Sequence, residues 1–476
     1  MTHIRFMRAS VRRLHPGKIT SAALLFFAWM PSALSQTATS DNTTAPSPSD
    51  ASSGLWERSN LLGDIGGLRT KLGNYGVSLA ITDVETLLGN VSGGVKQGAA
   101  MQGLTTATVQ LNTGKALGLP GGTFNVSALQ IHGNNNFSSG YLDDIQTANG
   151  TEAENSTRLW ELWYDQSFAG GAFDIKLGQQ SVDQEFIISK YGALFVNAFA
   201  GFPAVPSEDL YAGGPDYPLS SLGVRVQVKP TSAVTILAGV FDDNPSGGPF
   251  ARDPQSLDVG GTKFNLNTGA LFMGEVQFAT NLVVGQPGTY KLGFWYDTGN
   301  FPDQAVDQQG LSLASPASDG VAAMHRGNYS VYGVVDQTLW QPKDSPRSLN
   351  TFFSAMGAPG DRNLLSFSTY GGLTLTDPLP GRDNDTAGVY VGVVKVSGQA
   401  ANLDRAKAFF SGVNIPTRGA ETLIELTYQA QVTPWLQVQP DLQFILNPGG
   451  GLLNPNTPVE RLRNEVVVGV HTAVTF

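Results

Sequence analysis

Short segments of alternating apolar and polar residues recur along the chain, and this repeat limits the fold more than any other feature of the sequence. In the segment ETLIELTYQAQV, Ile424, Leu426 and Tyr428 fall on one face and Glu425 on the other. Side chains of a β-strand point alternately to opposite faces, so a period of two gives each strand one apolar and one polar face. The sequence therefore predicts an all-β fold.

Sixteen candidate strands can be distinguished by this pattern. Their apolar faces fit either a soluble sandwich, where they meet each other, or a membrane barrel, where they meet lipid. Strands of roughly ten residues, joined alternately by short and long connections, favour a transmembrane outer-membrane β-barrel of about 16 antiparallel strands. The strands are expected to start near residues 76, 104, 123, 158, 171, 221, 233, 268, 288, 328, 349, 364, 387, 420, 435 and 465.

The chain ends on one of these strands, EVVVGVHTAVTF, whose last residue is Phe476. A closed barrel needs its last strand to pair with its first, because no edge can be left unpaired in lipid. The terminal phenylalanine resembles the C-terminal aromatic residue by which outer-membrane barrels are recognised for assembly. We therefore expect Phe476 to contact the barrel assembly machinery.

The first 35 residues have the pattern of a secretory signal peptide. A basic stretch precedes the apolar run ITSAALLFFAWM, and ALS supplies small residues before Gln36. Residues 36–54 are rich in Ser, Thr and Pro and are expected to form a disordered tether. We expect export through the periplasm to the bacterial outer membrane.

Charge and cysteine content exclude several classes of protein. The leader carries five basic and no acidic residues, so its removal changes the formal net charge from -10 to -15. This acidity argues against nucleic acid as a partner. The chain has no Cys and no His pair at metal-ligand spacing, so no disulfide, metal or cofactor is expected.

The region between the tether and the first strand differs from the rest. Leucine and isoleucine residues recur between Trp56 and Leu72 at close to a 3.6-residue period, weakened by Gly63, Gly66 and Gly67. We expect a short amphipathic periplasmic helix within residues 55–73, a porin barrel over 74–476, and little helix elsewhere.

Several stretches resemble the carbohydrate-selective porins of the OprB family. They are LLGDIGGLRTKLGNYGVSL, GNVSGGVKQGAA, WELWYDQSF with IKLGQQSVDQEF, GAPGDRN, PLPGRDNDTAGVYVG, IELTYQAQVTPWLQVQPDLQFILNPGG and the final strand. The similarity runs in the family's order from about Leu55 to Phe476, and the extension before Leu55 departs from it. The resemblance implies a 16-stranded outer-membrane porin that passes small neutral sugars, monosaccharides such as glucose, and it leaves monomer or homotrimer open.

The connection between the fifth and sixth strands, residues 181–220, is the longest and contains FIISKYGALFVNAFAGFPAVP. An apolar connection of this length is expected to fold into the lumen and make the constriction, rather than to cover the mouth or contact another subunit. Its candidate pore-lining residues are Asp183, Glu185, Lys190 and Asn197.

Polar faces of the neighbouring strands are expected to supply the wall of the pore. Mixed charges can hydrogen-bond a neutral sugar, and an indole ring can pack on its apolar face. For single charged residues, a lattice of ion pairs that stiffens the wall is the alternative, and for the tryptophans it is an anchor at the lipid interface. The candidates are Glu161, Trp163, Asp165, Lys176, Gln180, Arg225, Trp295, Asp297 and Glu425.

Three other functions remain compatible with parts of the sequence. A general diffusion porin without sugar preference would share the architecture and differ only at the constriction. A barrel hydrolase would need a Ser, His and acid set, but only His132, His325 and His471 follow the leader and no G-x-S-x-G motif is present. A soluble carbohydrate-binding sandwich would dissolve without detergent. The sequence therefore favours a channel over an enzyme.

Overall fold

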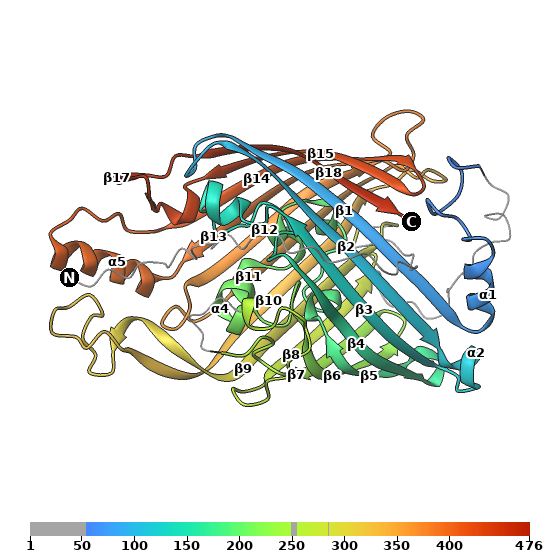
Figure 1. The fold of residues 1–476 in the computed structure, drawn as a ribbon, viewed down its shortest axis with the longest axis horizontal. Helices are drawn as coiled ribbons and strands as arrows, with labels where there is room; N and C mark the ends of the chain where they lie inside the picture. Colours follow the sequence, from blue (N-terminus) through green and yellow to red (C-terminus); the bar gives the residue numbers. More distant parts are fainter. Residues whose placement is uncertain (1–53, 249–254, 284) are drawn as a thin grey trace, which may run out of the picture.

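A computed structural model describes residues 54–248, 255–283 and 285–476. The expected leader over 1–35 and all but the last residue of the expected tether lie outside the described residues. Sixteen strands form one closed antiparallel barrel (Figure 1). They are β1 Val77–Ser92, β2 Gly98–Asn112, β3 Gly122–Gly133, β4 Ser156–Phe168, β5 Phe173–Gln180, β6 Ser221–Thr231, β7 Val234–Phe241, β8 Leu271–Thr280, β9 Gly288–Asp307, β10 Ala322–Trp340, β11 Ser348–Gly357, β12 Leu365–Thr376, β13 Thr386–Val396, β14 Ala420–Thr433, β15 Leu436–Leu446 and β18 Glu465–Thr475.

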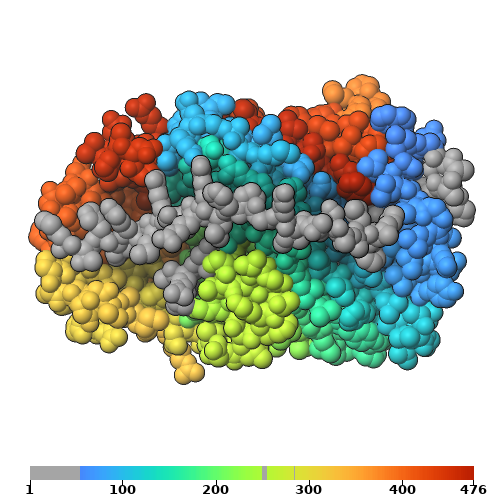
Figure 2. All heavy atoms as spheres, in the orientation of Figure 1, coloured from blue at the N-terminus to red at the C-terminus, as the bar shows by residue number. Residues whose placement is uncertain are grey.

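The all-β barrel predicted from the alternating pattern is confirmed, and each expected strand has a counterpart. Two further short strands, β16 Leu453–Asn454 and β17 Thr457–Arg461, pair only with each other in the connection after β15. The seam of the barrel joins β1 to β18, with Thr82 opposite Thr475 and Asn90 opposite Val467. Figure 2 shows the first and last strands, coloured blue and red, side by side on the surface. The C-terminal strand thus closes the barrel, as its sequence predicts.

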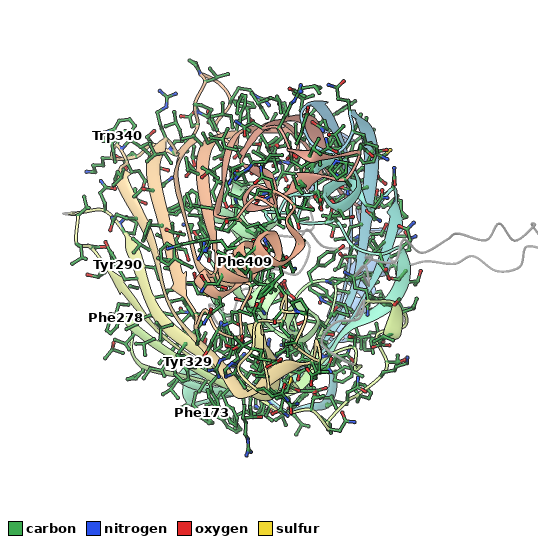
Figure 3. The ribbon with its side chains drawn as sticks, turned by 90° about the vertical axis from the view of Figure 1, so that its left-hand side faces the viewer. Phe173, Phe278, Tyr290, Tyr329, Trp340 and Phe409 are labelled. Carbon is green, nitrogen blue, oxygen red and sulfur yellow. The ribbon has the colours of Figure 1, made fainter. Side chains whose placement is uncertain are left out.

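The outer face of the barrel is apolar, and its inner face is polar or is packed against the connection after β5. On β9, Leu292 is 69% exposed, whereas its neighbour Lys291 donates to the carbonyl of Ile188 in the connection after β5, at 2.7 Å. Aromatic side chains gather on the outer rim (Figure 3), and Phe278 and Tyr290 are paired across β8 and β9. An apolar outer face with aromatic residues near the strand ends fits a bilayer.

The helices lie at the two ends of the barrel and inside it. The end with Phe476, called the terminal end here, also carries α1 and α2, and the opposite loop end carries α5 (Figure 1). The helices are α1 Leu68–Asn74, α2 Thr113–Leu117, α3 Ala198–Gly201, α4 Ala204–Asp209 and α5 Gly398–Ser411. Within the described ranges, no helix has both the length and the apolar character needed to cross a membrane.

The helices correct two expectations from the sequence. Helix α1 covers only Leu68–Asn74, and turns replace the expected helix before it, because Gly63, Gly66 and Gly67 adopt φ values of 56°, 65° and 90°. Helix α5 was not expected. Its start is capped by Ser397, whose hydroxyl accepts from the backbone N–H of Ala400 at 3.2 Å.

The segment around α1 packs against the terminal end of the seam. The N–H of Leu61 donates to the carbonyl of Thr475 at 2.8 Å, and the Arg69 guanidinium donates to Phe476 at 2.7 Å. The indole of Trp435, in the turn between β14 and β15, donates to the carbonyl of Leu55 at 2.8 Å. The beginning of the described chain therefore holds the end of the last strand.

Candidate functional site: an infolded segment against a polar wall

The connection between β5 and β6, residues 181–220, folds into the barrel and is called the infolded segment here. Its backbone bonds to strands beyond the two that it connects, from β8, three strands from β5, to β14, seven strands from β5. The carboxylate of Glu275 on β8 accepts from Ile187 at 2.9 Å, and that of Glu425 on β14 accepts from Val196 at 2.7 Å. The segment therefore crosses the lumen, as its apolar sequence predicts.

Wall carboxylates bind this segment by accepting its backbone N–H groups. Asp336 on β10 accepts from the N–H groups of Lys190 and Tyr191 at 3.0 and 3.2 Å and from the Ser189 hydroxyl at 2.7 Å. Glu425 accepts from Asn197 as well, at 3.2 Å. A buried N–H without an acceptor costs about 1–3 kcal/mol, so these carboxylates make the infolded path favourable.

Apolar contacts add to this attachment. Phe186, Phe199 and Val205 of the segment belong to one buried cluster with inward residues of the strands, among them Met273 and Trp295. Phe195 packs beside Phe352 and Tyr390, with ring centroids 5.4 and 5.3 Å away. One side of the segment is thus packed against the wall formed by β7 to β14.

The other side of the lumen, on β4, β5 and β6, is polar. The strand register places Asp165 opposite Lys176 and Lys176 opposite Arg225, so these three side chains form a row across neighbouring strands. The next inward row contains Asp174 and Gln227. Because inward residues alternate with outward ones, each strand contributes its polar face to the same patch of wall.

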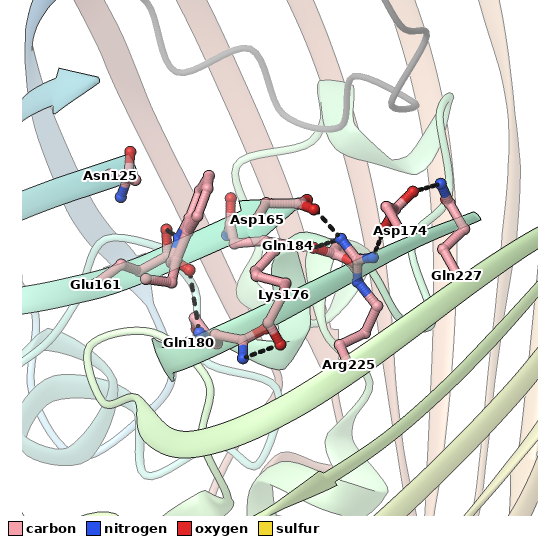
Figure 4. A network of polar contacts seen from close by, with 12 residues as sticks. Asn125, Glu161, Asp165, Asp174, Lys176, Gln180, Gln184, Arg225 and Gln227 are labelled. Carbon is pink, nitrogen blue, oxygen red and sulfur yellow. Dashed lines mark hydrogen bonds and ion pairs between the residues drawn. The ribbon is translucent and has the colours of Figure 1, made fainter. Parts of the chain in front are cut away.

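The infolded segment reaches this patch through Glu185. Figure 4 shows the network around Asp165, Lys176 and Arg225. The Glu185 carboxylate forms ion pairs with Lys176 and with Arg225, whose Nη2 lies 3.1 Å from Glu185 Oε1. The Arg225 guanidinium also pairs with Asp174, and with Asp165 at 3.2 Å. Two cations are therefore shared among three carboxylates from two strands and the segment.

Glu161 and Trp163 extend the patch along β4. Glu161 accepts from the Trp163 indole N–H at 3.1 Å and from the backbone N–H of Ser181 at 3.1 Å. The Lys176 ammonium lies 4.6 Å from the centroid of the Trp163 ring. We call the set Glu161, Trp163, Asp165, Asp174, Lys176, Glu185, Arg225 and Gln227 the polar cluster.

Several residues that were expected to line the pore are buried. Trp295, Asp297 and Glu425 expose none of their surface, and Asn197 and Gln180 expose 1% and 2%. Trp295 points inward but is covered by the segment, Asp297 accepts from the N–H of Gly299 at 2.7 Å, and Gln180 donates to the carbonyl of Gly223 at 3.0 Å. These residues hold the segment or the strands and leave little surface for a solute. Arg225, Lys176 and Glu161 of the polar cluster are also buried, at 3%, 6% and 7% exposure, and its exposed surface comes mainly from Trp163, Asp165 and Glu185.

The remaining two residues expected on the segment have different positions. Asp183 is half-buried and accepts from Gln184 at 3.2 Å and from the N–H of Tyr217 at 3.3 Å, so it ties two parts of the segment together. Lys190 is exposed, and its ammonium lies 5.2 Å from the centroid of the Tyr191 ring. A pore-lining role of Lys190, like that of the polar cluster, stays a prediction.

Some residues of the site were missed in the sequence. Asp174 and Gln227 are two positions from Lys176 and Arg225, and the period of two could have identified them. Glu275 and Asp336 also lie on inward faces, but nothing in their local sequence indicates that they bind a distant segment.

Asp209, at the end of α4, was missed as well. It is fully buried, one oxygen accepts from the N–H of Leu365 at 3.2 Å, and Oδ2 has no partner among the described residues. Burial raises the pKa of the Asp209 carboxyl well above its ordinary value of 3.8, and repulsion from Glu208 adds to the rise. The amide groups of Leu365 and Leu364 act in the opposite direction.

An apolar outer face, a polar inner wall and a segment folded into the lumen together define an outer-membrane channel of the porin class. Residues 96–476 match the family described as carbohydrate-selective porin, OprB family, and the chain belongs to that family. It is thus a sugar-selective porin of the bacterial outer membrane, and its family is one of channels.

Individual relatives agree with this assignment. The chain is 26% identical over 443 residues to Porin B of Pseudomonas aeruginosa, which covers 87% of this chain and 91% of the relative. Its fold resembles the high-pH structure of Pseudomonas putida OprB with a TM-score of 0.77 at 23% identity, covering 89% of this chain and 100% of that one. The low-pH structure of the same protein gives a TM-score of 0.54 at 18% identity, with coverages of 88% and 99%.

Proposed function

We propose that the channel passes monosaccharides such as glucose and selects them where the infolded segment faces the polar cluster. The observation that supports this most is Glu185, because it comes from the segment and pairs with Lys176 and Arg225 on the polar wall of β5 and β6. A solute that passes along this contact meets the partly exposed carboxylates of Glu185 and Asp165, while Lys176 and Arg225 are only 6% and 3% exposed and hold those carboxylates in place.

The chemistry of the polar cluster suits a neutral polyol. Ionised groups make stronger hydrogen bonds than neutral ones, and cations placed among carboxylates offer donors and acceptors at once. The half-buried Trp163 ring adds an apolar surface for the C–H face of a pyranose. A charged solute would instead meet both attraction and repulsion within a few ångströms.

Liposome swelling tests this proposal. Purified barrel in liposomes should admit glucose faster than an amino acid of similar size, and much faster than a disaccharide. The variant Glu185→Gln removes a charge at nearly constant volume and should reduce cation preference more than conductance. A ranking by size alone, unchanged by Glu185→Gln, would refute selection at the cluster and leave a general diffusion pore.

The proposal includes an orientation in the membrane. We infer that the terminal end faces the periplasm after export, because its connections, such as Ala169–Gly171 between β4 and β5, are short. Exposed outward side chains such as Leu292 then meet lipid. Protease added to intact cells should cut only at the loop end.

We further infer that Phe476 is the signal for barrel assembly. Its position at the end of the closing strand supports this. Deletion of Phe476 should lower the amount of heat-modifiable barrel in the outer membrane, and the barrels that do fold should conduct normally. Phe476→Tyr is the matched control, since it keeps an aromatic terminus. Normal assembly of the deletion variant would refute this role.

A further inference from the structure

Helix α5 extends beyond the strands at the loop end (Figure 1). It follows β13, yet it packs against β9, which lies four strands away around the barrel. In the view from the loop end, Phe409 lies inside the outline of the barrel, whereas Phe278, Tyr290 and Trp340 lie on its outer rim (Figure 3). The helix therefore crosses part of the channel mouth.

The base of α5 is firmly held, whereas its far end is open to solvent. Ala400 and Ala401 are buried, and Asp404 forms a two-point pair with the Arg418 guanidinium at 2.9 and 3.0 Å. Phe409 and Phe410 are 80% and 43% exposed. Their rings are edge to face, with centroids 5.1 Å apart and an interplanar angle of 80°. The connection thus holds two solvated aromatic rings at the entrance.

Polar side chains lie on the same face of α5 as these rings, between the start of the helix and Phe409. Gln399 accepts from the Asn402 amide at 2.9 Å, and Asn402 accepts from the Arg405 guanidinium. Arg405 and Phe409 are four residues apart and are neighbours on the helix surface. Planar amide and guanidinium groups beside an aromatic ring offer hydrogen bonds to hydroxyl groups and a flat surface to C–H groups.

We propose that this face of α5, formed by Gln399, Asn402, Arg405, Phe409 and Phe410, is a carbohydrate-binding site at the channel entrance. It captures a pyranose before the sugar reaches the infolded segment. The choice of ligand rests on the proposed function. Lipid is disfavoured as the occupant, because Phe409 lies within the outline of the mouth while the lipid-facing aromatic residues lie on the rim.

The site has a specific kinetic consequence. A weak site at the entrance raises the local sugar concentration, so it matters when glucose is scarce and not when the constriction is saturated. Loss of both rings in Phe409→Ala with Phe410→Ala should lower glucose entry about threefold at low concentration, given the modest energy of a single aromatic contact. Glucose entry at saturating concentration and conductance for potassium chloride should not change.

The experiment measures entry of labelled glucose and of an amino acid of similar size into proteoliposomes, over a range of concentrations. Val459→Ala is the matched control, because it removes an 88% exposed apolar side chain from β17 at the same end. Phe409→Trp keeps a stacking ring and should retain wild-type entry. Each variant is first checked for heat-modifiable mobility.

Several outcomes would overturn the inference. The first is glucose entry by the double alanine variant that equals wild-type entry at all concentrations. The second is a loss of amino-acid entry as large as the loss of glucose entry, and the third is a loss of glucose entry that Val459→Ala reproduces. A change in oligomeric state on loss of the rings, with unchanged sugar entry, would identify the face as a contact between copies. In each of these cases the proposed function stands if wild-type protein still prefers glucose. If wild-type protein shows no such preference, the proposed function itself fails.

Discussion

Two connections leave the barrel at the same end and take opposite courses. The infolded segment, residues 181–220, returns into the lumen, while residues 397–419 with α5 stay outside it. The first is bound by carboxylates of three different strands, Glu275, Asp336 and Glu425. The second is held near its own base by Ser397 and the pair between Asp404 and Arg418.

The difference shows what draws a connection into a channel. An apolar sequence alone leaves backbone N–H groups unpaired in a crowded interior, which costs free energy. Inward carboxylates on distant strands remove that cost by accepting those groups. The α5 connection satisfies its backbone within a helix and has no need of such acceptors. We therefore expect the two connections to respond differently to mutation.

Excision of each connection in turn should give the largest difference in conductance between the two. Replacement of residues 186–209 by a short Gly-Ser linker removes the part of the segment that crosses the lumen, so conductance should rise by at least about twofold. Discrimination between glucose and a disaccharide should flatten. The same linker in place of residues 399–416 should leave conductance nearly unchanged in planar-bilayer recordings. Similar conductance from both excisions would place the constriction elsewhere.

Loss of one wall carboxylate should have the next largest effect. Asp336→Ala leaves Ser189, Lys190 and Tyr191 without their acceptor and should destabilise the docked segment by about 3 kcal/mol. Noisy single-channel currents of higher mean conductance should follow. Asp336→Asn keeps an acceptor oxygen and should lie between this variant and wild type. Quiet wild-type currents from Asp336→Ala would contradict the role of wall carboxylates.

A pH dependence separates the two connections further. The raised pKa of Asp209 means that its contribution to docking is fully present below the ordinary value of 3.8 and is lost as pH rises through the folded value. Current noise from the segment should therefore grow with rising pH. Asp209→Asn keeps an acceptor for Leu365 and should flatten this dependence. An identical pH profile in both proteins would exclude Asp209 as its origin.

The smallest effect is expected at the base of α5. Arg418→Ala removes both side-chain donors to the buried carboxylate of Asp404 and leaves it only the Arg418 backbone N–H, which should cost the α5 connection about 2 kcal/mol. Limited proteolysis should then cut faster within residues 398–419, while barrel stability and conductance stay at wild-type values. Arg405→Ala, on the exposed face of α5, is the control for loss of one arginine. A conductance change with Arg418→Ala alone would indicate that α5 influences the constriction.

The barrel could be predicted from the sequence because each strand alternates between apolar residues, which face outward, and polar residues, which face inward. Leu426 faces outward at 44% exposure and Glu425 faces inward at 0%, as the alternation predicts. The pairing across the seam could be predicted as well, because the last strand pairs with β15 on one side and closure leaves its other edge no partner but the first strand.

The candidate site could be predicted only in part. The inward rows on β4 to β6 follow from the period of two, so Glu161, Lys176 and Arg225 were identified. The partners of the infolded segment do not follow from any local pattern, because Val196 and Glu425 are 229 positions apart. The alternation correctly predicts that Trp295 and Glu425 point inward, so they were expected to line the pore. It does not predict that the infolded segment covers them.

The seam also has a consequence for biosynthesis. The Thr86 Oγ1 and His471 Nδ1 atoms lie 2.9 Å apart across the seam. The two residues are 385 positions apart in the chain, so this contact has a very large sequence separation. Contacts of this kind form late, because the entropy of closing the intervening loop must be overcome first. Without the final strand, β1 and β15 would each keep an unpaired edge that can join strands of other chains. A prematurely terminated product is therefore an aggregation hazard and cannot act as a smaller pore.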